Sequence, residues 1–157
     1  MPAGSAGHVP KIVVGVDGSP SSRAALRWAV SQAALDGGVV DAVLAWQIPA
    51  LLRNYTWPPI YLEEAGDFET AARKTLEAVI SEEIEPADRQ LVTSRVVKGH
   101  PAQVLLGAAA DADLLVVGSR GRSAAARARL GSVCLHCLKH ARCPVLIMHG
   151  QPGRAAA

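Results

Sequence analysis

The segment from residue 118 to residue 132 has the residue types that a chain of phosphate groups requires. Glycines stand at Gly118, Gly121 and Gly131, and Ser132 follows where a helix is predicted to begin. Between the first and last of these glycines the charged residues are all arginines: Arg120, Arg122, Arg127 and Arg129. Glycine lets the backbone approach a ligand closely and adopt positive φ, and the N–H groups and dipole of a helix start favour an anion. A triphosphate matches this combination, and the alternative is a solvent-exposed loop with ordinary helix capping.

A second segment, from Gly15 to Ser19, follows a predicted strand and contains one carboxylate. Because a carboxylate repels phosphate, we expect Asp17 to bind sugar hydroxyls or a divalent cation, with Gly15 and Val16 beside it. The alternative is that Asp17 forms an Asx turn before Gly18. In an open parallel sheet, ligands collect at the carboxyl ends of the strands where the strand order reverses. The two segments would therefore face one crevice if their strands are neighbours.

A third group of chemically capable residues lies in the last predicted helix. Cys134 and Cys137 form a CxxC pair, and His140 and Cys143 follow. A helix start favours the thiolate, so a thiol-redox pair or a metal site is one hypothesis. The other is that these cysteines are small buried hydrophobic residues. We favour the second, because zinc needs four converging ligands and Cys143 begins a strand.

The elements that must position these residues alternate between strands and helices. Apolar runs bounded by turn residues predict strands at 11–17, 39–46, 91–97, 113–118 and 145–149. Helical spacing predicts helices at 67–83, 102–110 and 132–140, and one from Pro20 to the Gly37–Gly38 stop, capped by Ser19. This alternation predicts right-handed crossovers and a parallel sheet with helices on both faces. Half of the residues are hydrophobic but few are aromatic, and a core of Val, Leu, Ile and Ala fits strands buried on both faces.

Two features lie beside these elements. Residues 47–65 contain three prolines and three aromatic residues without a clear period, and so long a connection is more often functional or mobile. His100 precedes Pro101 in a turn, where we expect a structural or ligand-side contact, with a catalytic base as the alternative.

Composition limits the class of protein. A chain of 157 residues fits one domain, which we place at 11–149 between disordered tails at 1–10 and 150–157. A net charge of +2 does not indicate nucleic acid or a membrane as partner. We find no apolar run of signal-peptide or membrane-spanning length. Three cysteines do not suggest a disulfide framework. We therefore expect a cytoplasmic protein.

Known nucleotide-binding loops can be compared directly with this chain. It contains neither GxxxxGK[ST], the P-loop pattern, nor GxGxxG, the usual dinucleotide pattern. The spacing Gly118-x2-Gly121-x9-Gly131-Ser132 instead resembles the G-x2-G-x9-G-[ST] signature of ATP-binding universal stress proteins. The chain is similar to that family over 11–149, in the runs VVGVDGSPSSRAALRWA, GHPAQVLL, ADLLVVGSRGR, LGSV and CPVLIM.

The resemblance implies a Rossmann-like α/β fold, an open five-stranded parallel sheet of order 3-2-1-4-5. It also implies bound ATP, with or without Mg²⁺, and a homodimer formed through the last strand. Asp17 would meet the ribose or the metal-bound phosphates, and Ala45 would line the adenine pocket. The remaining expected contacts surround the phosphates: Gly118, Gly121, Gly131, Ser132, the backbone of Val133, Cys134, and the cations Arg120, Arg122 and Arg127.

Two residues depart from the family pattern. Ser123 stands where relatives often have glycine, and Cys134 stands where they often have serine. A β-carbon at position 123 restricts the loop, and a thiol is a poorer phosphate donor than a hydroxyl. Both changes bear on affinity, and neither removes the glycine framework.

Three functions remain open from the residues. We expect a nucleotide-dependent signalling module of the stress response. A slow ATPase or phosphate-transfer enzyme is the first alternative, and a thiol-redox protein using Cys134 and Cys137 is the second. Phosphoryl transfer needs positioned cations and an oriented nucleophile. We find no general base placed beside a water site, so we favour binding over turnover.

Overall fold

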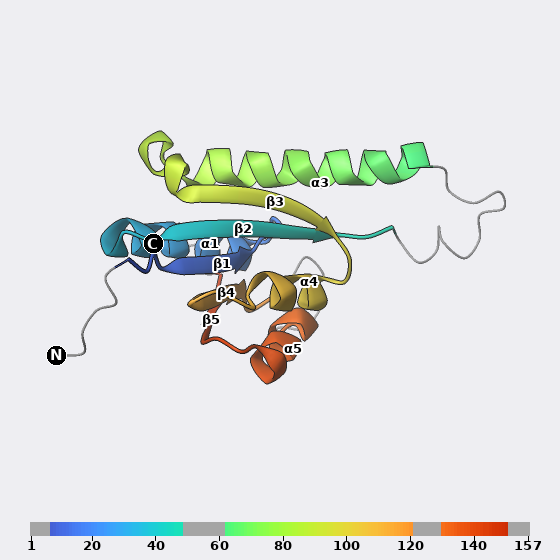
Figure 1. The fold of residues 1–157 in the computed structure, drawn as a ribbon. Helices are drawn as coiled ribbons and strands as arrows, with labels where there is room; N and C mark the ends of the chain where they lie inside the picture. The colour runs from blue at the N-terminus through green and yellow to red at the C-terminus, as the bar shows by residue number, and fades with distance from the viewer. Residues whose placement is uncertain (1–6, 49–61, 121–129, 151–157) are drawn as a thin grey trace, which may run out of the picture.

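The computed structural model describes residues 7–48, 62–120 and 130–150 of the chain. Strands and helices alternate along these ranges (Figure 1). Their bounds are β1 (Lys11–Gly15), α1 (Pro20–Asp36), β2 (Val39–Trp46), α3 (Leu62–Glu83), the 3₁₀ helix η1 (Pro86–Leu91), β3 (Val92–Lys98), α4 (Pro101–Ala108), β4 (Leu114–Gly118), α5 (Ser132–His140) and β5 (Val145–Met148).

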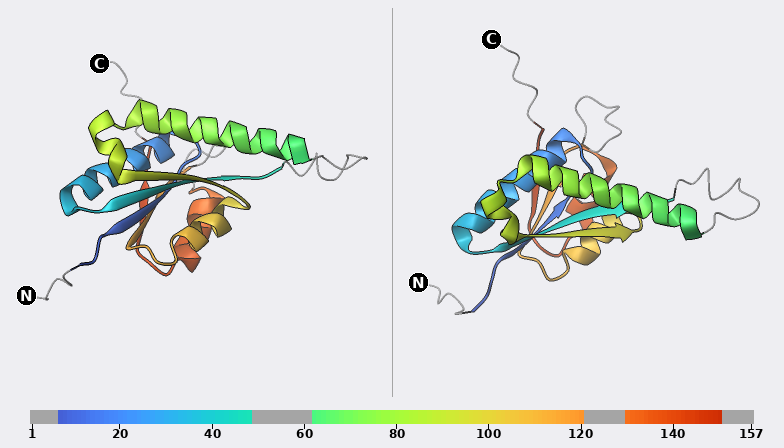
Figure 2. Two further views of the ribbon diagram at one scale, coloured as in Figure 1. Left: turned by 45° about the horizontal axis from the view of Figure 1, so that its top comes forward. Right: turned by 90° about the horizontal axis from the view of Figure 1, so that it is seen from above.

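The five strands form one parallel sheet in the order β3-β2-β1-β4-β5, as predicted. α1 and α3 pack on one face, and α4 and α5 pack on the other (Figure 2). This is the doubly wound arrangement that alternating strands and helices favour. Its strand order reverses between β1 and β4, which are direct neighbours.

The two faces of the sheet have separate cores. Val14 and Val116 pack with α1 and α3, whereas Val13, Leu115 and Val117 pack with α4 and α5. Successive side chains of a strand point to opposite faces, so β1 and β4 need apolar residues at every buried position. Full burial of each such side chain contributes about 1.5–3 kcal/mol. This explains why the most apolar runs of the sequence are the central strands.

The start of α1 is fixed directly after β1. Ser19 caps the helix, and its Oγ accepts a hydrogen bond from the N–H of Ser22 at 3.3 Å. Pro20 occupies the first turn, and Gly37 ends the helix with φ 70°. Both ends of α1 therefore form as predicted, for the expected reasons.

The bounds of β1, β3, α4, β4 and β5 differ from the sequence-based prediction by one or two residues, and two elements differ more. α3 begins at Leu62 rather than Asp67. Residues 62–65 are good helix formers, but the apolar period that revealed the helix starts only at Phe68. The helix η1 was not predicted, because a single short 3₁₀ segment has no period to detect.

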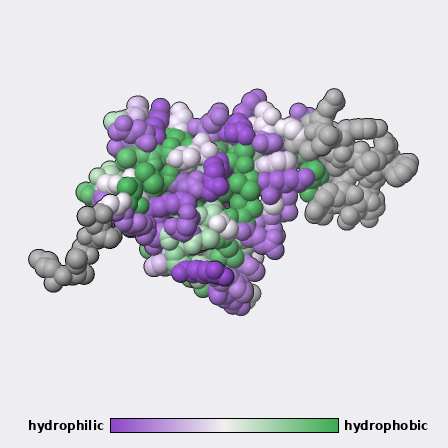
Figure 3. All heavy atoms as spheres, in the orientation of Figure 1, coloured by the Kyte–Doolittle hydropathy of each residue, from purple (hydrophilic) through white to green (hydrophobic). Residues whose placement is uncertain are grey.

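The face shown in Figure 3 interleaves hydrophilic and hydrophobic residues. Among the residues that the structure describes, no helix combines the length and the apolar character that crossing a membrane requires.

Candidate functional site

The candidate site lies at the carboxyl ends of β1 and β4. The chain leaves β1 towards α1 on one face of the sheet and leaves β4 towards α5 on the other. In doubly wound folds, ligands bind at the carboxyl ends of two strands whose connections diverge in this way. The two segments selected from the sequence therefore lie at one place in the fold.

Backbone hydrogen bonds draw together the two ends of the segment between β4 and α5. The N–H of Ser119 donates to the carbonyl oxygen of Met148 at 2.8 Å, and the N–H of Gly131 donates to the carbonyl oxygen of Ser119 at 2.8 Å. Ser119 is buried. The start of α5 is consequently held beside the end of β4.

The first turn of α5 can accommodate an anion. Gly131 is the N-cap with φ −64° and ψ 158°, and no side chain of the described residues caps the helix. The first intrahelical bond runs from the N–H of Leu135 to the carbonyl of Gly131. The N–H groups of Ser132, Val133 and Cys134 therefore precede the helical ladder, and the first turn contains no acidic residue.

The backbone of Arg120 is bound to the start of α1. The hydroxyl of Ser21 donates to the carbonyl oxygen of Arg120 at 2.7 Å, and that of Ser19 donates to the same oxygen at 3.2 Å. The N–H of Arg120 in turn donates to Oγ of Ser21 at 3.4 Å. These serines connect the two halves of the site. Sequence reasoning used Ser19 only as a helix cap and missed Ser21, because nothing local signals a partner 99 residues away.

The glycines of the site do not have the conformation expected of them. The prediction of positive φ is wrong for Gly118 and Gly131, and Gly121 lies outside the described residues. At this edge of the sheet positive φ occurs at Gly18 (84°) and Gly99 (148°) instead. Gly131 adopts extended backbone that any residue can take.

Gly118 and Gly15 are small because helices pack against them. A β-carbon on Gly118 would lie 2.4 Å from Oγ of Ser21 and 2.8 Å from the backbone nitrogen of Ser22. One on Gly15 would lie 2.7 Å from Cδ1 of Leu105. The space that glycine leaves is thus taken by α1 and α4. Packing therefore gives a reason for glycine at 118 in addition to the predicted close approach of a ligand.

Asp17 forms the turn that the sequence left as its alternative reading. The N–H of Ser19 donates to Oδ1 of Asp17 at 2.9 Å, and the N–H of Asp17 donates to Oγ of Ser22 at 3.3 Å. The side chain is half-buried at the end of β1. This Asx turn fixes the carboxylate directly after β1 through one of its two oxygens, so the turn and a ligand contact are compatible.

Val16 and Ala45 also lie at the carboxyl ends of the strands, after β1 and near the end of β2. Val16 is buried, and its N–H donates to the carbonyl of Val43 at 2.9 Å. Gly15 pairs in register with Val43, so Ala45 extends beyond the end of β1. Ala45 is half-buried. The predicted positions Gly121, Arg122 and Arg127, together with Ser123, lie outside the described residues.

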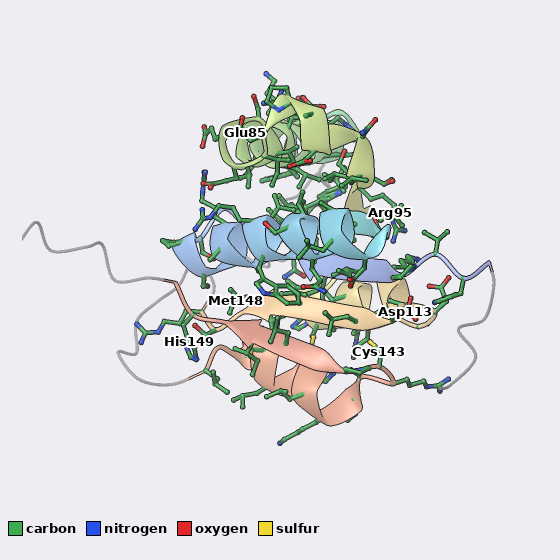
Figure 4. The ribbon with its side chains drawn as sticks, turned by 90° about the vertical axis from the view of Figure 1, so that its left-hand side faces the viewer. Glu85, Arg95, Asp113, Cys143, Met148 and His149 are labelled. Atoms are coloured by element: carbon green, nitrogen blue, oxygen red, sulfur yellow. The ribbon has the colours of Figure 1, made fainter. Side chains whose placement is uncertain are left out.

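The cysteines belong to the core and not to a reactive site. Cys134 and Cys137 are free thiols buried between the sheet and α5. Burial raises the pKa of Cys134 and raises that of Cys137 to about 11, so both are thiols at neutral pH. Cys143 precedes β5 and lies at the end of the sheet away from Met148 (Figure 4). The structure supports the small-hydrophobe hypothesis for Cys134 and Cys137.

His100 has a structural function at the start of α4. It is the N-cap of that helix, and its Nδ1 accepts a hydrogen bond from the N–H of Ala102 at 3.3 Å. Among the described residues, no group of three or more His, Cys, Asp or Glu side chains could hold a metal ion.

The strand order and the helices on both faces define a doubly wound α/β domain. The sequence model of the universal stress protein family matches residues 8–149. The chain belongs to the universal stress protein family.

Curated relatives carry the same family name. The chain is 35% identical over 149 residues to a universal stress protein of Mycobacterium tuberculosis, which covers 88% of this chain and 47% of the relative. It is 31% identical over 150 residues to one of Mycolicibacterium smegmatis, covering 88% of this chain and 48% of the relative. The chain thus spans about half the length of these relatives.

Solved structures share the fold. A universal stress protein in complex with cAMP is 28% identical with a TM-score of 0.56, covering 90% of this chain and 98% of that one. A family member from Burkholderia pseudomallei is 26% identical with a TM-score of 0.62, covering 88% and 94%. UspA of Lactobacillus plantarum is 24% identical with a TM-score of 0.63, covering 90% and 98%, and supports the fold alone.

Proposed function

We propose that the chain binds an adenine nucleotide, with ATP as the expected ligand, and acts as a nucleotide-dependent module of the stress response. The observation that carries this proposal is the hydrogen bond between the N–H of Gly131 and the carbonyl of Ser119. It sets the start of α5, which no described side chain caps, beside the ends of β1 and β4. The related structure in complex with cAMP supports the choice of an adenine nucleotide.

The residues at this edge fit such a ligand. The N–H groups of Ser132, Val133 and Cys134, with the hydroxyl of Ser132, would hold phosphate oxygens at the positive end of α5. Arg120 would add a cation, and the proposal extends to Gly121, Arg122 and Arg127, which lie outside the described residues.

The other end of the site suits the nucleoside. Asp17 would hold ribose hydroxyls or, when Mg²⁺ accompanies the phosphates, serve as a carboxylate ligand of that ion. Ala45 would line the adenine pocket, and Gly15 and Val16 would form the end of β1 beside it. The phosphate groups and the sugar would thus contact different elements, α5 and the turn after β1.

Mass spectrometry of the purified protein tests the proposal most directly. A native spectrum compared with a denatured one would reveal a co-purified nucleotide and its identity. Calorimetric titration of nucleotide-free protein with ATP, AMP and cAMP would then rank the ligands. Absence of nucleotide in the first experiment together with no heat of binding in the second would overturn the proposal.

We propose binding without rapid turnover. The alternative of a slow ATPase or phosphate-transfer enzyme predicts multiple turnovers of phosphate release that depend on the start of α5. Phosphate release from purified protein, with Gly131→Asp as the comparison, separates the two. Clear multiple turnover abolished in the variant would favour the enzyme.

We further propose a cytoplasmic homodimer that pairs through β5. This strand lies at the edge of the sheet, and Val145, Leu146, Ile147 and Met148 are all half-buried. An apolar edge strand is a ready template for pairing with a second copy. Sedimentation of the wild type against Ile147→Lys tests the dimer: a monomeric wild type would exclude it. Cell fractionation tests the location.

A further inference from the structure

Arg23 connects the turn after β1 to the far end of α3. Its Nε donates to the carbonyl oxygen of Gly18 at 3.1 Å. Its Nη1 donates to Glu82 at 2.6 Å and to Glu83 at 3.1 Å. We propose that Arg23 is a positioning residue for the nucleotide site, holding the turn that carries Asp17 in one orientation from α3. This inference rests on the proposed function.

The geometry of one peptide unit gives the reason. The carbonyl of Gly18 and the N–H of Ser19 belong to the same planar peptide group. Arg23 binds its oxygen, and Oδ1 of Asp17 accepts from its N–H at 2.9 Å. Rotation of this plane would therefore move the carboxylate of Asp17, and Arg23 opposes that rotation.

The turn needs such support because of its backbone. Gly18 has φ 84°, and a glycine is free to adopt both signs of φ at little cost. A hydrogen bond from a charged donor to its carbonyl selects one conformation among several. Arg23 therefore reduces the loss of conformational entropy that the turn would undergo when Asp17 binds a ligand.

The guanidinium is itself anchored. Its planar fork places Nε on the turn and Nη1 on two carboxylates at once, which a single ammonium group does not reproduce. The side chains of Arg23 and Glu83 are half-buried, with 28% and 17% of their surface exposed. Hydrogen bonds to Glu82 and Glu83 raise the pKa of Arg23, so its charge is constant over the working range of pH.

Arg27 provides a matched control. It lies one helical turn further along α1 and also donates to Glu83. In the described part of the chain it makes no hydrogen bond to the turn after β1. Arg27→Lys therefore perturbs the same carboxylate without touching the carbonyl of Gly18.

Nucleotide titration of Arg23→Lys, Arg27→Lys and the wild type tests the inference. We expect Arg23→Lys to bind ATP roughly tenfold more weakly, and Arg27→Lys to bind like the wild type. Both titrations are made without a divalent cation, so that Asp17 can contact the sugar but not a metal ion. For dideoxyadenosine triphosphate, which lacks both ribose hydroxyls, the loss in Arg23→Lys should then vanish. A merely structural role would weaken both ligands equally, and that result, or no loss for ATP, would overturn the inference.

Amide hydrogen exchange separates failure of this inference from failure of the proposed function. Without any ligand, the Ser19 amide should exchange several-fold faster in Arg23→Lys than in the wild type. In Arg27→Lys its exchange rate should equal that of the wild type. If the wild type bound no nucleotide, this measurement would still decide whether Arg23 holds the turn. Equal exchange in all three proteins would then overturn the inference.

Discussion

The α-carbon of Gly118 faces Ser21 so closely that a β-carbon there would lie 2.4 Å from the serine Oγ. Two backbone atoms of α1 would also lie within 2.9 Å of it. A side chain can rotate away, but the backbone of α1 is fixed by its packing against the sheet. The glycine that the sequence associates with phosphate binding is therefore required for docking α1 onto β4.

Gly118→Ala should destabilise the fold by about 1–3 kcal/mol, because overpacking forces α1 away from β4. Urea unfolding followed by circular dichroism measures this. Gly107→Ala is the control: it lies in α4 with nothing within 4 Å of the added carbon, and should stabilise by about 0.5–1 kcal/mol. Equal stability of both variants would contradict the packing role. Loss of nucleotide in Gly118→Ala would not by itself identify a phosphate contact.

Gly131→Asp and Gly131→Asn form an isosteric pair that isolates charge at the start of α5. Both residues are favoured N-caps, and φ −64° with ψ 158° suits either. We expect both to keep or raise the thermal stability of the protein. The aspartate should abolish ATP binding by repelling phosphate, whereas the asparagine should weaken it less. Identical titrations for the two variants would argue that no phosphate approaches this turn.

The three cysteines should resist thiol reagents in the native protein. Burial raises the pKa of all three, that of Cys137 to about 11. Reaction with a disulfide reagent in mildly alkaline buffer should therefore be slow and should accelerate on adding urea. Rapid modification of Cys134 or Cys137 in the folded state would revive the thiol-redox alternative.

Cys134→Ser should cost stability rather than restore a phosphate donor. The side chain of Cys134 is buried among apolar neighbours, and an unsatisfied hydroxyl there costs about 1–3 kcal/mol. Cys134→Ala is the comparison without a polar group. Because the side chain points into the core, ATP affinity should change little in either variant, as calorimetric titration would show.

Because of the ion pairs of Glu83, the free energy of unfolding should fall at acid pH. Burial raises the pKa of Glu83, but hydrogen bonds from Arg27 and Arg23 outweigh it and hold the pKa below its ordinary 4.5. A carboxyl whose pKa is lowered by folding stabilises above its unfolded pKa, and this contribution is lost as pH falls through the folded value. Glu83→Gln should cost about 1 kcal/mol at neutral pH and less in acid.

Unfolding free energies of the wild type and Glu83→Gln, measured from neutral pH down through 4.5, check this. Glu69→Gln is the control, since it removes an exposed pair with Arg73 on the same helix. A gap between Glu83→Gln and the wild type that stayed constant into strong acid would show that Glu83 is not charged in the folded state.

Much of the fold followed from local patterns. β1 and β4 were recognisable because strands buried on both faces need apolar residues throughout. The start of α1 was recognisable because Ser19 and Pro20 act on their own helix turn. The spacing of Gly118, Gly131 and Ser132 also located the edge where β4 and α5 meet.

The atoms that bind one another across that edge were decided by tertiary structure. Ser21 is hydrogen-bonded to the backbone of Arg120, 99 residues away in the sequence, and Arg23 is hydrogen-bonded to Glu82, 59 residues away. Sequence spacing carries no information about such contacts, because the sheet and its crossovers set the distances. Likewise, whether the Cys134 thiol faces a ligand or the core depends on how α5 rests on the sheet. Residue types and short-range spacing thus determined the elements and the edge, while packing decided which groups there are free to act.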